Sequence, residues 1–207
     1  MAISRFRARA LAFAVSAAAL TGLTTVASTG TALACGPSGP SDTFASTLPQ
    51  VRPGGSGATV LGLQLNLKAR GYPLVGTGYY GPNTLRAVKD VQRQHHIKAS
   101  GIVGSKTWHV LVGTLNASVT RKPREPRETL RPGAHSNVVY ELSGALERIP
   151  PYNDGRLAHQ DRTYGPALQK ITRDFQHRAR IKASGIVGAK TWHALYQVVA
   201  IEGNWGC

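Results

Sequence analysis

The sequence predicts an all-α protein made of two tandem small three-helix modules joined by a linker rich in proline and arginine. The main observation is an internal repeat: residues 97–111 read IKASGIVGSKTWHVL, and residues 181–195 read IKASGIVGAKTWHAL. In addition, apolar residues recur at helical spacing around both copies, and glycine and proline separate these runs. A fixed-period copy sets the unit of architecture, so we predict two modules of about sixty residues each.

The repeat extends upstream and defines the module boundaries. Tyr80-Gly81-Pro82 returns as Tyr164-Gly165-Pro166 at an offset of 84, whereas Pro53-Gly54 returns as Pro132-Gly133 at an offset of 79. The second copy therefore carries five extra residues (84 − 79) between its first helix and the Tyr-Gly-Pro turn. The predicted segments are 35–47 as a flexible leader, 48–113 as module one, 114–129 as the linker, 130–203 as module two and 204–207 as a C-terminal tail.

Three helices are predicted in module one. The first is indicated by apolar residues at helical spacing, namely Val60, Leu63 and Leu67. It ends at Gly71, and Pro82 suits the first turn of the second helix, where its missing N–H costs nothing. The buried face of that second helix is expected to hold Thr84, Ala87, Val88 and Val91. A third helix is predicted over about 105–111.

Module two repeats this plan with different side chains. Its first apolar face is expected to hold Val139, Leu142, Leu146 and Ile149, and its second Leu168, Ile171 and Phe175. Pro150-Pro151 ends the first helix, and a third helix from Ala189 can run through Val199 before Gly203. Each module is close to the lower size limit for a self-sufficient core, so packing of one module on the other, or a terminal disulfide, would stabilise both.

The first 34 residues have the pattern of a secretory signal peptide. Three arginines precede an apolar run of eleven residues (10–20), and Ala32-Leu33-Ala34 offers a cleavage site. Because eleven residues are too few to span a bilayer, we expect a secreted, extracellular mature chain without a transmembrane segment. Two alternatives stay open: a retained membrane-buried helix, and lipidation of Cys35, although Ala32 stands where a lipobox usually has leucine.

The two cysteines, Cys35 and Cys207, stand at the two ends of the expected mature chain. Outside the cell such a pair is expected to form a disulfide. In the chain-entropy model this bridge would stabilise the fold by about 5 kcal/mol at most. The alternatives are two unpaired thiols or a cross-link to another molecule. Neither cysteine has the positioned base that a catalytic thiolate needs.

The charge of the chain is strongly positive. Lys and Arg number 25 and Asp and Glu number 10, which gives +15; without the three arginines of residues 1–34 the balance is 22 against 10, or +12. Such a surplus indicates polyanionic partners, which outside the cell include anionic wall polymers, carboxylate-bearing peptide stems, anionic membrane and free DNA. The linker shares this character, because RKPREPRE at 121–128 predicts an extended, solvated segment.

The repeated residues resemble the peptidoglycan-binding type 1 domain, a small three-helix module found on secreted wall enzymes. In module one the resemblance rests on Leu63-Gln64, Gly71-Tyr72, Gly78-Tyr79-Tyr80-Gly81, Val91-Gln92 and the string at 101–108; in module two it rests on Tyr164-Gly165, Phe175-Gln176 and the string at 185–192. Ser100 and Ser184 stand where the family commonly has Asp, and module two has Pro150-Pro151 in place of Gly-Tyr. These departures leave open whether both modules bind ligand or one is purely structural.

The residues expected to bind peptidoglycan are Tyr80, Gln92, Ser100, Gly101 and Trp108 in module one, and Tyr164, Gln176, Ser184, Gly185 and Trp192 in module two. Tryptophan can stack on a sugar ring, and glutamine and backbone amides can bond to carboxylate or acetamido oxygens. Each type also has a structural alternative. The tryptophans can fill a small core, the tyrosines can pack under the turn, the glutamines can face solvent, and the glycines can supply positive φ.

No catalytic residue, metal site or cofactor is predicted. His95-His96 are adjacent and would point about 100° apart on a helix, so they cannot chelate one ion together. His109 and His193 lack further ligands at a usable spacing. The carboxylates are scattered singly, and neither an H-E-x-x-H nor a G-x-S-x-G string occurs.

The leading prediction is a secreted, non-catalytic and monomeric protein that binds peptidoglycan or associated anionic wall polymers through two tandem modules. One alternative is an accessory or targeting subunit, or an inhibitor, of a wall hydrolase. Another is a basic polyanion- or DNA-binding protein, although the secretion signal argues against a specific nucleic-acid partner. A wall hydrolase is disfavoured because the two modules leave only leader, linker and tail.

Overall fold

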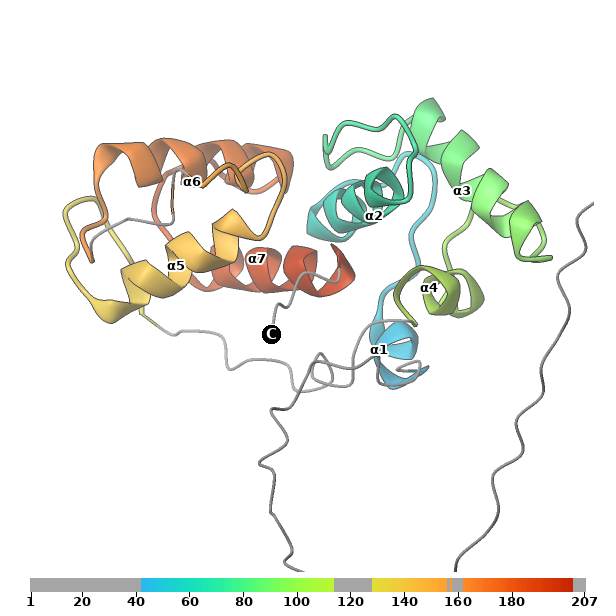
Figure 1. Ribbon diagram of the computed structural model, residues 1–207, viewed down its shortest axis with the longest axis horizontal. Coiled ribbons are helices and arrows are strands. Elements are labelled where there is room, and N and C mark those ends of the chain that lie inside the picture. The colour runs from blue at the N-terminus through green and yellow to red at the C-terminus, as the bar shows by residue number, and fades with distance from the viewer. Residues whose placement is uncertain (1–41, 114–127, 156, 158–161, 203–207) are drawn as a thin grey trace, which may run out of the picture. The chain divides into compact units, whose positions relative to one another are not determined.

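The structure is a computed structural model and describes residues 42–113, 128–155, 157 and 162–202. These residues form helices joined by turns and isolated β-bridges (Figure 1). The helices are α1 (Asp42–Thr47), α2 (Ala58–Ala69), α3 (Pro82–Gln94), α4 (Ser105–Val112), α5 (Asn137–Glu147), α6 (Pro166–Arg178) and α7 (Ala189–Glu202). The all-α prediction is therefore confirmed for the described residues. The predicted signal peptide, Cys35, Cys207, the linker up to 127 and the tail lie outside them.

Helix α1 lies inside the segment that we expected to be a flexible leader. Ala45 is buried in the core of module one, and Phe44 and Leu48 pack against the same core. Helix α1 contacts α4. This end of the leader is ordered because its apolar residues cover the third helix of the module, a contact that the polar composition of residues 35–47 as a whole conceals.

Module one packs α2, α3 and α4 around a single core. The residues predicted for the buried faces of its first two helices are buried: Val60, Leu63, Leu67, Thr84, Ala87, Val88 and Val91. An antiparallel bridge between Val51 and Val103 ties the segment before α2 to the turn before α4, with N–H···O distances of 3.0 and 2.9 Å. The bridge closes the module around its own N-terminal segment.

Module two has the same arrangement, with α5, α6 and α7 in place of α2, α3 and α4 (Figure 1). The bridge between Leu130 and Val187 is the counterpart of the first. The four residues predicted for the first apolar face are buried, as are Leu168 and Phe175, while Ile171 is partly buried against the same core. The predicted long third helix is confirmed, since α7 runs through Val199 to Glu202.

The two modules pack directly on each other through α2 and α7, which lie side by side (Figure 1). Leu61 and Leu65 of α2 belong to the core of module two, and Ile201 of α7 belongs to the core of module one. Two hydrogen bonds cross the same contact: Asn66 Nδ2 donates to the Ile201 carbonyl (2.8 Å), and Gln197 Nε2 donates to Thr59 Oγ1 (2.7 Å). Each apolar side chain buried here contributes about 1.5–3 kcal/mol. The modules are therefore one folded unit.

Helix α2, the first helix of module one, packs its outer face against the other module, whereas α5, the first helix of module two, does not. Gly62 of α2 allows close approach, because a Cβ at this position would lie 2.9 Å from the Ile201 Cβ. In α5, the position that corresponds to Leu61 at the offset of 79 is Tyr140, which is 63% exposed. A Cβ on Gly144 of the same helix would meet nothing within 4 Å. The contact is thus head to tail, from the end of module two to the start of module one.

Candidate functional site

In module one the repeated string forms a turn that is held by two buried side chains. Gly101 has φ +77°, a left-handed conformation that favours glycine. The Tyr80 hydroxyl donates to the Gly101 carbonyl (2.6 Å), and the Gly101 N–H donates to Gln92 Oε1 (2.9 Å). Gln92 Nε2 in turn donates to the Ile102 carbonyl (2.9 Å) and to Thr107 Oγ1 (3.1 Å). The glutamine amide is therefore fully engaged inside the protein.

The same network recurs in module two with nearly identical distances. Tyr164 Oη donates to the Gly185 carbonyl (2.7 Å), and the Gly185 N–H donates to Gln176 Oε1 (2.9 Å). Gln176 Nε2 donates to the Ile186 carbonyl (2.9 Å) and to Thr191 Oγ1 (3.0 Å). Burial raises the pKa of both tyrosine hydroxyls, because the charged phenolate would be poorly solvated there.

The two tryptophans fill the module cores. Trp108 and Trp192 are each 0% exposed. Their indole N–H groups donate to the carbonyls of Pro49 (2.9 Å) and Glu128 (3.0 Å), which tie down the segment that enters each module. Neither ring presents a face to solvent, so both tryptophans occupy the core position that the sequence left as an alternative.

Of the ten residues expected to contact ligand, only the two serines reach the surface. Ser100 is exposed and Ser184 is half-buried, and each hydroxyl accepts a hydrogen bond of 3.2 Å from the N–H two residues later. The other eight are buried: Tyr80, Gln92, Gly101, Trp108, Tyr164, Gln176, Gly185 and Trp192. The structure thus brings the tyrosine, glutamine, serine and glycine of each set together around one turn, whereas the tryptophan of each set lies in the module core and bonds to the entering segment.

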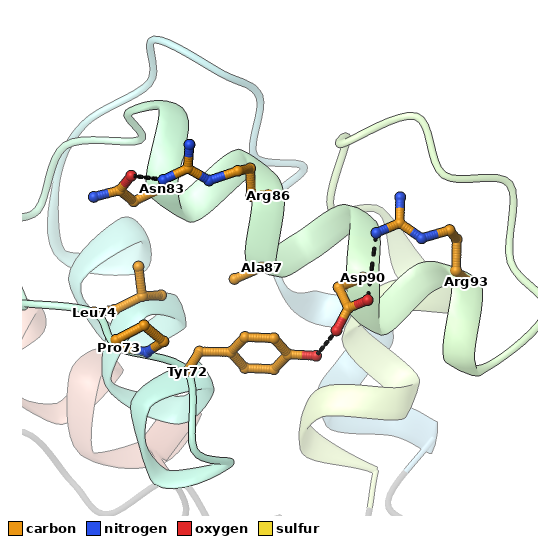
Figure 2. A pocket seen from close by; sticks show the side chains of 8 residues that line it. All are labelled: Tyr72, Pro73, Leu74, Asn83, Arg86, Ala87, Asp90 and Arg93. Carbon is orange, nitrogen blue, oxygen red and sulfur yellow. Dashed lines mark hydrogen bonds and ion pairs between the residues drawn. The ribbon is translucent and has the colours of Figure 1, made fainter.

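An open hollow lies elsewhere in module one, between α3 and the segment after α2 (Figure 2). It has a volume of about 340 Å³, and we call it the α3 groove. Its lining consists of Tyr72, Pro73, Leu74, Asn83, Arg86, Ala87, Asp90 and Arg93. The buried side chains of Leu74 and Ala87 contribute apolar surface to it, and Arg86 and Arg93 project from α3 at its two ends (Figure 2).

Asp90 is the central polar group of the α3 groove. Its Oδ2 accepts hydrogen bonds from the Tyr72 hydroxyl (2.8 Å) and from Gln94 Nε2 (2.9 Å), and its Oδ1 pairs with Arg93 Nη2 at 3.3 Å. The bond from Tyr72 is the main cause that holds the pKa of this carboxyl below its ordinary value. Burial and the hydrogen bond to Asp90 raise the pKa of Tyr72. Asp90 is thus an ionised acceptor that fixes Tyr72 and Arg93.

A second hollow of about 410 Å³ shares Tyr72 and Asp90 with the α3 groove. Arg70, Gln94 and His95 belong to its lining. Arg70 is held in place by Asn66 Oδ1 (3.0 Å from Nε) and by the Leu111 carbonyl (2.8 Å from Nη2). Arg70 therefore places a fixed guanidinium beside this hollow.

Module two contains the same tyrosine–aspartate pair in a different setting. Tyr152 Oη donates to Asp174 Oδ2 at 2.6 Å, so Tyr152 replaces the tyrosine of the Gly-Tyr pair that the sequence of module two lacks. Arg178 Nε also donates to Asp174 Oδ2 (2.8 Å), while its Nη1 donates to the Gly76 carbonyl of module one (3.1 Å). Hydrogen bonds from Tyr152 and Arg178 hold the pKa of Asp174 low against its burial.

Sequence reasoning missed the tyrosine–aspartate pairs and the arginines of the α3 groove. A signal was available, since Asp90 and Asp174 stand at the repeat offset of 84. Their tyrosine partners, Tyr72 and Tyr152, are 80 apart, a spacing that the insertion in module two disguises. Among the described residues, no cluster of three His, Cys, Asp or Glu side chains could hold a metal ion. None of the described helices is long and apolar enough to cross a membrane.

Comparison with known proteins agrees with the duplicated architecture. The sequence matches the family described as "Putative peptidoglycan binding domain" twice, over residues 56–111 and 135–195. It is also 30% identical over 152 residues to a "Probable N-acetylmuramoyl-L-alanine amidase" of Bacillus licheniformis. That alignment covers 68% of this chain but 43% of the relative. The chain therefore belongs to the peptidoglycan binding domain family and carries two tandem copies of the domain.

Proposed function

We propose that this protein binds peptidoglycan at the cell exterior without cleaving it, as a secreted monomer associated with the cell wall. The observation that carries the proposal is the duplicated binding domain, whose two copies account for residues 56–111 and 135–195 and pack into one unit through α2 and α7. The signal-like segment at 1–34 supports export, and the surplus of basic residues favours an anionic matrix.

We infer that the sequence similarity to the amidase arises from the two binding domains. The two matched regions and the segment between them span residues 56–195, which is 140 residues (195 − 56 + 1), and the alignment with the relative runs over 152 residues and covers 68% of this chain. The similarity thus has nearly the length of the tandem domains. On this proposal the similarity reflects a shared means of attachment to the wall.

The test is sedimentation of the mature chain with insoluble peptidoglycan sacculi in two forms, one intact and one stripped of anionic polymers. Retention on both forms at about 0.15 M salt supports recognition of peptidoglycan itself, because screening at this salt weakens purely electrostatic adsorption of exposed charges. Retention on the intact form alone would assign binding to the anionic polymers. A chain that stays in the supernatant with both forms would refute the proposal.

A further inference from the structure

We propose that the two modules are not equivalent: the α3 groove of module one takes a carboxylate-bearing stem peptide of the wall, while the corresponding position in module two holds the modules together. This inference rests on the proposed function and adds to it a site and a class of ligand. It follows from the charged side chains of the α3 groove, from the shape of the groove, and from the residues that occupy the corresponding positions in module two.

Two guanidinium groups mark the ends of the α3 groove. Arg86 and Arg93 are seven residues apart on α3, so they lie on nearly one face and about 10 Å apart along the helix axis. The Arg86 side chain bonds to the neutral amide of Asn83, and the Arg93 side chain is 62% exposed and pairs with Asp90. A guanidinium carries five N–H donors and can hold a carboxylate in a two-pronged, charge-assisted contact. Arg86 therefore suits one ligand carboxylate, and Arg93 suits a second one beside Asp90.

The space between the two arginines suits an extended peptide. Pro73, Leu74 and Ala87 supply apolar surface, and the half-buried ring of Tyr72 forms a side wall (Figure 2). The Asp90 carboxylate lies between Ala87 and Arg93, where Tyr72 and Arg93 hold it. An extended chain advances about 3.3 Å per residue, so two carboxylates about three residues apart would reach both arginines. A short acidic peptide supplies these two carboxylates, whereas in a glycan strand that carries stem peptides the lactyl carboxyl of each muramic acid is used up in an amide bond.

Module two has lost the features that make this surface a binding groove. At the offset of 84, Asn83 becomes Ala167, Arg86 becomes Lys170, Ala87 becomes Ile171 and Arg93 becomes His177. Both two-pronged donors are thus replaced, and the small floor residue is exchanged for a larger one. Tyr152 is only 5% exposed, whereas its counterpart Tyr72 is half-buried.

The same part of module two is also engaged with module one. Arg178, which stands at the position of Gln94, spans from Asp174 to the Gly76 carbonyl. Two residues later, Arg180 Nε donates to the Thr77 carbonyl at 3.1 Å. Arg178 and Arg180 at the end of α6 therefore hold residues 76–77 of module one through hydrogen bonds. In module two this part of the surface serves contact between the modules instead of ligand binding.

The inference is tested on the full mature chain by calorimetric titration with a synthetic stem tetrapeptide, Ala-γ-Glu-Lys-Ala, with free carboxylates. The probe is compared with the same peptide after amidation of its carboxylates. We expect Arg86→Ala/Arg93→Ala to weaken binding of the free acid by about tenfold or more, because two charge-assisted contacts are lost. The matched control, Lys170→Ala/His177→Ala, changes two exposed side chains at the same positions of module two and is expected to bind like the parent.

The outcomes separate this inference from the proposed function. If the parent chain binds neither sacculi nor the peptide, the proposed function itself fails. If the parent binds sacculi but not the free-acid peptide, or binds the amidated peptide equally well, the assigned ligand class is wrong. If Arg86→Ala/Arg93→Ala binds like the parent, or the module-two variant loses as much, the assignment to module one is wrong. Arg86→Lys/Arg93→Lys, which keeps the charge, should recover part of the affinity without a change in melting temperature.

Discussion

The Tyr80 hydroxyl donates a 2.6 Å hydrogen bond to the carbonyl of Gly101, and Tyr164 makes the same bond to Gly185 at 2.7 Å. Both pairs join the Tyr-Gly-Pro turn to the repeated string, which explains why the two motifs keep one offset while the segments before them do not. The turn is therefore a structural unit that each module needs in order to close.

Removing this hydroxyl should destabilise the fold. We predict that Tyr80→Phe and Tyr164→Phe each lower the free energy of unfolding by about 1–3 kcal/mol, because a buried carbonyl loses its partner. Tyr140→Phe is the control, since Tyr140 is 63% exposed and its change should stay within about 0.5 kcal/mol. Urea unfolding followed by circular dichroism measures all three. Equal stabilities for the buried and exposed variants would contradict the assigned role.

Truncation of the tryptophans separates a core role from a ligand role. Trp108→Ala should lower the free energy of unfolding by about 3–5 kcal/mol, because it empties a fully buried site. The milder Trp108→Phe should lower the melting temperature but leave sacculus binding unchanged at temperatures where the variant is folded. An unchanged melting temperature together with lost binding would instead place the indole in the ligand contact.

The contact between the modules depends on a small residue in α2. Gly62→Leu should lower the free energy of unfolding by about 1–3 kcal/mol, because its side chain would collide with Ile201. The matched variant Gly144→Leu in α5 meets no neighbour at its Cβ, so we expect no loss and a gain of up to about 1 kcal/mol from helix propensity. Thermal unfolding of both variants is the measurement. Equal losses would argue against the α2–α7 contact.

Stability should depend on pH through Glu202 at the end of α7. Its Oε2 is buried without a hydrogen-bond partner, and burial raises the pKa of the carboxyl to about 8, against the opposing charge of Lys68. An acid with a raised pKa in the folded state stabilises the fold fully below its unfolded pKa of about 4.3, and this contribution is lost as the pH rises through about 8.

The free energy of unfolding of the parent should therefore fall between about pH 5 and about pH 8, and Glu202→Gln should remove that part of the slope. Glu141→Gln changes an exposed carboxyl and serves as the control. Denaturant titrations at several pH values measure the slope. A Glu202→Gln variant with the slope of the parent would exclude this carboxyl as its source.

Much of the fold is predictable because its causes are local. The apolar spacing of Val60, Leu63 and Leu67, the proline that begins α3 and the repeated string identify the helices directly. The contact of α2 with α7 is not predictable in this way, because Leu61 and Leu65 simply lengthen an apolar run whose second partner lies in the other module. Buried Gln64 and Asn66 likewise find their partners only in the folded chain.

The candidate site was harder to predict than the fold. Aromatic and amide side chains in a repeated motif suit ligand binding and turn support equally well, and burial decides between the two. Gln92 illustrates this, because its side-chain amide is hydrogen-bonded to Gly101, Ile102 and Thr107. A ligand-binding role for Arg86 and Arg93 could not be predicted from the sequence, because isolated arginines on a helix are usually solvated. Only the fold places these two side chains at the ends of one groove.

The most direct measurement is the fraction of the mature chain that pellets with polymer-stripped sacculi at about 0.15 M salt, with the supernatant assayed for soluble wall fragments. The proposed function predicts saturable retention and no fragment above the level released from sacculi alone. Fragment release by the pure chain, or a chain that remains in the supernatant, would contradict it.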